Sequence, residues 1–145
     1  HGDTMVSMLN HTTVNGKPVL DLVKDGLLKK DSLDNIVQRT KSGGAEIVKL
    51  LERGSAFYAP AASGVEMAES YLKDLKKQLP CAAYLDGEYE VKDLYVGVPV
   101  VIGKNGIEKI IEINLSEEEK NNLKNSIKAV TELFDAAKKI DPFLA

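Results

Sequence analysis

Histidine is the side chain in this sequence best suited to moving protons near neutral pH, and the 145 residues include His1 and His11. An imidazole has an ordinary pKa of about 6.5, so it can accept or release a proton under physiological conditions. Judged by spacing alone, neither histidine has a catalytic partner or a metal-ligand spacing, and such histidines are more often structural. We therefore expect His11 to be a half-exposed strand residue, and we expect no protein-ligated metal.

Other reactive side chains have structural explanations. Ser116 followed by Glu119 has the spacing of a capping box, in which each side chain bonds the backbone amide of the other. The run of carboxylates there indicates a helix start rather than an acid–base pair. Glu88 and Glu90 flank a turn and should be solvated, and Ser63 has no base near it in the sequence.

Composition restricts the class of protein. A net charge of −3 and a pI near 5.5 argue against general nucleic-acid binding, which requires a basic face. No apolar run approaches the roughly 20 residues needed to span a bilayer. Cys81 is the single cysteine, which excludes an internal disulfide and favours a reducing, cytoplasmic location. The length is that of one ordinary domain.

The first third of the chain should supply one strand, or two short strands around Asn15-Gly16, and then a short helix or loop over residues 21–28. A helix is predicted over residues 32–53, capped by Asp31 or Ser32. Two readings of Gly43-Gly44 stay open: a break in this helix, or a continuous helix that another backbone approaches closely. The stripe at helical spacing comprises Ile36, Thr40, Ile47 and Leu51.

A second helix is predicted over residues 60–77, with Pro60 at its first position, where a missing N–H needs no partner. Lysines near its end would interact favourably with the helix dipole. Its predicted buried stripe comprises Ala61, Val65, Ala68, Leu72 and Leu75.

The middle of the chain predicts an antiparallel meander of about three strands, with turns at Asp86-Gly87 and at residues 104–106. Pro99 would place its strand at an edge or a bulge. The last helix should begin after Ser116 and bury one face. This order of elements predicts an α+β domain without a Rossmann unit, and no G-x-G-x-x-G fingerprint occurs. The predicted buried face comprises Leu123, Ile127, Val130, Leu133, Phe134 and Ala137.

The string HGDTMV, at residues 1–6, resembles the catalytic-histidine motif of the lactate/malate dehydrogenase family. The resemblance continues in order along nearly the whole chain, and its later blocks look most like the malate branch of bacterial enzymes built on the lactate-dehydrogenase plan. Those blocks are TVNG at 13–16, GSAFYAPAAS at 54–63, MAESYLKD at 67–74 and the stretch from GEYEVKD at 87–93 to LSEEE at 115–119.

The resemblance implies that residues 1–145 are a C-terminal catalytic and substrate domain, and that an N-terminal Rossmann domain binding NAD is absent from this chain. His1 then corresponds to the proton acceptor, with Gly2 keeping the backbone beside it permissive. Ala56 falls where the family lines the substrate pocket, and Pro60 where it packs against nicotinamide. The family's aspartate that orients the histidine, and its arginines that clamp the substrate carboxylate, lie upstream and are not in this chain; Asp3 is no substitute.

The implied activity is NAD-dependent, reversible oxidation of (S)-malate to oxaloacetate, a dicarboxylate reaction of the tricarboxylic acid cycle. L-Lactate dehydrogenase is the alternative, because the loop that discriminates the two substrates lies in the missing half. A reading of another class is that the isolated chain is a non-catalytic folding and assembly module. The family implies a cytoplasmic homo-oligomer, dimer or tetramer. We expect the Gly43-Gly44 helix to pack closely against a neighbouring subunit or the missing domain, with the Ser116 helix as the alternative. The chain departs from the family pattern at Ser7, where proline is expected, and at Asn10-His11, where arginine and tyrosine are expected.

Overall fold

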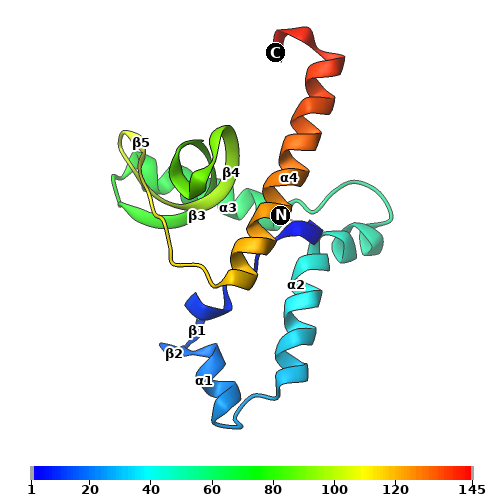
Figure 1. Ribbon diagram of the computed structural model, residues 1–145, viewed down its shortest axis with the longest axis vertical. Coiled ribbons are helices and arrows are strands. Elements are labelled where there is room, and N and C mark those ends of the chain that lie inside the picture. Colours follow the sequence, from blue (N-terminus) through cyan, green and yellow to red (C-terminus); the bar gives the residue numbers. More distant parts are fainter. Residues whose placement is uncertain (1, 145) are drawn as a thin grey trace. The chain divides into compact units, whose positions relative to one another are not determined.

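The structure is a computed structural model that describes residues 2–144 (Figure 1). The chain divides into two compact units. The first comprises the residues up to Ser55 together with Ser116–Ser126, and the second comprises Ala56–Leu115 together with the residues from Ile127 onward. The α+β class predicted from the order of elements is confirmed, with antiparallel strands and long helices.

The first unit opens with turns rather than a long strand. Short 3-10 turns at Gly2–Thr4 and Leu9–His11 precede a two-stranded hairpin of β1, Thr13–Val14, and β2, Lys17–Pro18. The hairpin turns at Asn15-Gly16, where both φ angles are positive (50° and 80°), as a type I′ turn requires. Of the two predicted alternatives, two short strands around this turn are therefore confirmed, and a single strand is not. The prediction for His11 was wrong, since His11 ends a 3-10 turn and is exposed.

Helix α1, Val19–Lys24, leads to α2, Lys30–Leu51, which runs without a break through Gly43-Gly44. The predicted continuity of the helix is therefore confirmed, but the close approach of another backbone, which the same reading included, is not. A Cβ added at either glycine would meet no described atom within 4 Å, so no other backbone from residues 2–144 approaches there. The predicted caps were wrong, because α2 begins one residue before Asp31 and its N-cap makes no side-chain hydrogen bond.

The α2 stripe is largely exposed within this chain. Ile36 is 56% exposed, Ile47 41% and Leu51 46%, while Leu33, one turn before Ile36 on the same face, is buried. Exposed apolar patches of this kind are typical of surfaces that contact other protein.

A three-stranded antiparallel sheet forms the core of the second unit, in the order β3 (Lys77–Asp86), β4 (Lys92–Gly103), β5 (Gly106–Ile110). The predicted meander is confirmed, although its third strand ends five residues before Leu115. Alternate residues of β3 and β4 face inward because side chains alternate along a strand. The buried apolar side chains of this unit are Ala83, Leu85, Val91, Val96, Val98, Val100 and Ile102.

Pro99 lies in the central strand, so the prediction of an edge strand was wrong. Pro99 stands directly opposite Pro80 of β3, and its carbonyl accepts a hydrogen bond from the Ile111 amide, 2.9 Å away on the β5 side. Backbone N–H and C=O of one strand residue point the same way, so the missing N–H would also face β5. The proline therefore removes no hydrogen bond between β4 and β3. The register shift lies two residues further on, between Val101 and Ile102.

Helix α3, Tyr58–Leu72, packs on this sheet. It starts two residues before Pro60 and stops before the lysines that were expected in its last turn. The predicted buried stripe is exposed: Val65 is 67% and Leu72 78% exposed, and Leu75 lies beyond the helix. The side that faces the sheet instead carries Ser70, which is fully buried, and Met67, whose Sδ lies 3.2 Å from Cys81 Sγ of β3.

The last helix, α4, spans Glu117–Ile140 and begins as predicted. The Glu119 amide donates to Ser116 Oγ (3.2 Å), and the Ser116 amide donates to Glu119 Oε2 (2.8 Å), which confirms the capping box. The predicted apolar face is only half-buried over Leu123, Ile127 and Val130. Leu133, at 72% exposure, does not belong to a core of this chain.

Candidate active site

The predicted proton acceptor, His1, lies outside the described residues. The chain that follows it begins with Gly2, whose φ of +61° falls in the left-handed region that side chains other than glycine rarely adopt. The expectation that glycine is needed for backbone freedom at this position is therefore confirmed. The adjoining turn, Gly2–Thr4, packs against α2 within the first unit.

Ala56 and Pro60 lie at the start of the second unit. Ala56 is half-buried in the loop that leads into α3, and Pro60 is the third residue of that helix and is exposed. Pro60 breaks no hydrogen bond, because the first four N–H groups of a helix have no partner within it. The first turn of α3 carries no acidic residue, and Tyr58 is 90% exposed. This helix start therefore presents an uncharged, accessible surface.

No carboxylate clamp is assembled from residues 2–144. The chain's arginines are Arg39 and Arg53. Arg39 is engaged within α2, where its Nε and Nη2 atoms donate to the two carboxylate oxygens of Glu46 at 3.1 and 2.9 Å. This fork-to-fork pair raises the pKa of the Arg39 guanidinium and lowers that of the Glu46 carboxyl. A second, substrate carboxylate would have to compete with Glu46 for Arg39.

The start of α4 holds the segment that follows His1. Asn10 Nδ2 donates a hydrogen bond of 3.1 Å to Glu119 Oε2, and the Ser126 hydroxyl lies 3.4 Å from that of Thr4. Sequence reasoning assigned Glu119 only to the helix cap and gave Asn10 no role. The pair is 109 residues apart, so no local pattern could have indicated it.

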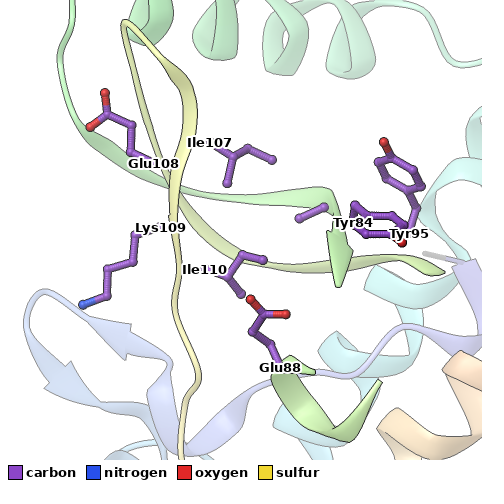
Figure 2. Close-up of a pocket in the computed structure, with 8 residues that line it drawn as sticks. Tyr84, Glu88, Tyr95, Ile107, Glu108, Lys109 and Ile110 are labelled. Atoms are coloured by element: carbon purple, nitrogen blue, oxygen red, sulfur yellow. The ribbon is translucent and has the colours of Figure 1, made fainter. Parts of the chain in front are cut away.

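Two hollows on the described surface are lined by neither Ala56 nor Pro60. Figure 2 shows one along β5, where Ile107, Ile110 and Glu88 approach the edge-to-face pair Tyr84–Tyr95, whose ring centroids are 5.5 Å apart. Glu108 and Lys109 point away from the two rings in that view. This hollow offers no convergent set of proton-transfer groups. A second hollow, on α2, is lined by Ile36, Arg39, Thr40, Gly43, Glu46 and Ile47.

The described part of the chain contains no grouping of three His, Cys, Asp or Glu residues placed to hold a metal ion. Cys81 is a half-buried free thiol whose Sγ lies 3.2 Å from Met67 Sδ, and burial raises its pKa, which makes it a poor nucleophile. Among residues 2–144, no helix is long and apolar enough to cross a membrane.

Comparison with known proteins gives the chain its context. Residues 1–141 match the family model described as lactate/malate dehydrogenase, alpha/beta C-terminal domain. A malate dehydrogenase of Pelagibacter ubique is 62% identical over all 145 residues, which span 45% of that protein. The chain thus spans less than half the length of the curated relatives it matches.

Two solved structures show the same fold. Malate dehydrogenase of Cryptosporidium parvum is 47% identical with a TM-score of 0.93, over 96% of this chain and 44% of that one. Lactate dehydrogenase of Eimeria maxima, solved with NADH and oxamate, is 45% identical with a TM-score of 0.91, over 97% of this chain and 44% of that one. The chain therefore belongs to the lactate/malate dehydrogenase family, whose alpha/beta C-terminal domain it forms.

Proposed function

We propose that the parent protein is an NAD-dependent malate dehydrogenase, which interconverts (S)-malate and oxaloacetate, and that this chain is its catalytic and substrate domain. The observation that carries the proposal is the 62% identity, over every residue of the chain, to a protein named malate dehydrogenase. The resemblance of HGDTMV to the family's catalytic motif supports the same assignment.

His1 is the proposed proton acceptor. Oxidation of malate removes a proton from the hydroxyl oxygen and a hydride from the carbon that bears it, so that the C–O bond becomes a carbonyl. NAD, when bound, supplies the hydride acceptor. The imidazole of His1 takes the hydroxyl proton, and returns it when oxaloacetate is reduced. The ordinary pKa of a histidine side chain, about 6.5, suits proton transfer in both directions near neutral pH.

Ala56 and Pro60 fit the contacts proposed for them. A methyl side chain at Ala56 leaves room beside the reacting carbon for a four-carbon dicarboxylate. Pro60, exposed on an uncharged first turn, offers an apolar surface on which a nicotinamide ring could pack. No carboxylate of that turn would repel the negatively charged substrate or cofactor. The arginine clamp and most of the NAD site are assigned to the part of the parent protein outside this chain.

Lactate dehydrogenase is the second candidate, because the Eimeria maxima enzyme matches the fold almost as well as the Cryptosporidium parvum malate dehydrogenase does, with TM-scores of 0.91 and 0.93. The test is to assay the full-length parent protein with NADH and either oxaloacetate or pyruvate. The proposal expects a much larger kcat/KM for oxaloacetate. A larger value for pyruvate would replace malate dehydrogenase with lactate dehydrogenase.

We further propose that the parent protein acts in the cytoplasm, within the tricarboxylic acid cycle, as a homo-oligomer assembled through α2. The exposed side chains of Ile36, Ile47 and Leu51 support this choice of surface. Sedimentation of this chain alone is the check, and a highly soluble monomer would count against association through α2.

A further inference from the structure

The segment that follows His1 has no regular structure of its own to fix it. Between Gly2 and His11 its backbone forms only short 3-10 turns, and its backbone hydrogen bonds in that stretch join near neighbours, such as Met5 to Gly2 and His11 to Met8, both 3.0 Å. Such a segment takes its place from long-range contacts. The position of any side chain attached to it depends on those contacts as well.

Helix α4 supplies contacts of this kind. Thr4 meets Ser126 and Asn10 meets Glu119, so the segment runs along α4 in the opposite direction to the helix. Ser126 and Glu119 are seven residues apart, which puts them on one face, about 10 Å apart along the axis. Residues 116–126 belong to the same compact unit as the start of the chain. The first turns of α4 are thus a fixed support under the segment.

Glu119 is the strongest of these contacts. Its side chain is only 6% exposed, and its Oε2 atom accepts hydrogen bonds from both the Ser116 amide and Asn10. Burial raises the pKa of the Glu119 carboxyl, but the hydrogen bonds from Ser116 and Asn10 outweigh it and hold that pKa below its usual value. The group is therefore an ionised carboxylate at neutral pH, and bonds to a charged acceptor are stronger than neutral ones.

Asn10 supplies one of the two hydrogen bonds that stabilise the buried charge of the Glu119 carboxylate. Glu119 Oε1 is buried and accepts no hydrogen bond from the residues described, so Oε2 must satisfy the charge. A buried carboxylate that loses a donor is destabilised by an amount larger than the bond itself. Moving Asn10 away from α4 would therefore raise the free energy of the folded chain.

We propose that Glu119 is a positioning residue for catalysis: through Asn10 it fixes the segment that carries His1, and thereby the imidazole that exchanges the proton. The inference rests on the proposed role of His1. A general base works only within hydrogen-bond reach of the proton it takes, and a displacement of about 1 Å can reduce the rate by a factor of about 100.

The experiment uses the full-length parent protein. Asn10→Ala removes the bond to the segment but leaves the capping box of α4 intact. Glu117→Gln is the matched control for Glu119→Gln, because Glu117 lies in the same helical turn, is exposed and bonds only the Lys120 ammonium (2.7 Å) among the contacts resolved for it. Each variant is measured at a temperature where circular dichroism shows it to be folded.

Asn10→Ala should lower kcat for oxaloacetate by about tenfold or more, with KM changed by less than about threefold, since substrate binding does not involve this bond. Glu119→Gln should lower kcat less, because an amide oxygen still accepts from Asn10. The double variant should be no worse than Asn10→Ala, since both changes act on one bond. Glu117→Gln should keep the wild-type kcat.

A melting temperature that falls for Asn10→Ala while kcat stays near the wild-type value would overturn the inference and leave Glu119 a purely structural residue. Additive losses in the double variant would also overturn it. Failure of the proposed function looks different: the wild-type parent would turn over neither oxaloacetate nor pyruvate, or His1→Asn would stay active.

Discussion

Replacing Ser70 with alanine should destabilise the second unit, because this fully buried hydroxyl joins α3 to two strands. Its Oγ donates to the Ile102 carbonyl of β4 at 2.7 Å and accepts from the Lys77 amide of β3 at 3.2 Å. Alanine would fill the space without strain but would leave a buried carbonyl and a half-buried amide without their partner. Both losses fall on the junction where the helix ends and the sheet begins.

The magnitude follows from these two bonds. Each neutral hydrogen bond contributes about 1 kcal/mol net, and an unsatisfied buried carbonyl adds about 1 kcal/mol or more. Alanine regains about 0.5 kcal/mol through its higher helix propensity. The free energy of unfolding should therefore fall by about 2.5 kcal/mol, which for a chain of this size lowers the melting temperature by about 8 °C.

The assay is thermal unfolding of this chain followed by circular dichroism, together with hydrogen exchange of the Lys77 amide, which should become faster in Ser70→Ala. Ser63→Ala is the matched control, since it makes the same change at an exposed position of the same helix. That control should be neutral or slightly stabilising. If the two variants melted within about 1 °C of each other, the role assigned to the Ser70 bonds would be refuted.

Three further outcomes are expected. Gly103→Ala should destabilise the β4–β5 hairpin by about 1–2 kcal/mol in urea unfolding, because an added Cβ would lie 2.6 Å from Glu108 Oε1 and 2.8 Å from Asp74 Oδ1; adding Glu108→Ala should recover part of the loss, and no recovery would contradict the steric cause. The stability difference between wild type and Glu119→Gln should be largest at neutral pH and shrink below about pH 4, since a carboxyl whose folded pKa is lowered stabilises the fold above its unfolded pKa and loses that contribution as the pH falls through the folded value; a difference independent of pH would argue against an ionised Glu119. Calorimetric titration of this chain alone with NADH should show no micromolar binding, because the Rossmann domain is assigned to the rest of the parent protein, and micromolar binding would refute the non-catalytic reading of the isolated chain.

Features set by neighbouring residues could be predicted from the sequence. The hairpin at Asn15-Gly16 and the capping box of Ser116 and Glu119 both depend on interactions within four residues, and both formed as expected. The meander also followed from local alternation and turns. The family was indicated by five blocks of sequence in register, of which the string at residues 1–6 is the first.

Features set by distant packing were misjudged, for two physical reasons. Apolar periodicity in α3 predicted a buried face that is exposed in this chain. The residue of α3 that is fully buried against the sheet is Ser70, whose side chain is polar and was not part of the apolar pattern. The pair of Asn10 and Glu119 joins the two ends of the chain, so only the folded structure could reveal it. Pro99 was assigned to an edge or a bulge because the sequence does not show where β5 ends. The central strand accepts this proline because its missing N–H faces Ile111, one residue beyond the end of β5.

The opposed prolines of the sheet have a consequence for self-association. β3 is an edge strand, and Pro80 lies directly opposite Pro99. The backbone C=O and the missing N–H of Pro99 face β5, so those of Pro80 point away from the sheet. An incoming strand would find no hydrogen-bond donor at that point, in the middle of the longest free edge. Pro80 therefore disfavours edge-to-edge pairing of β3 with another strand, and with it the aggregation that such pairing can start.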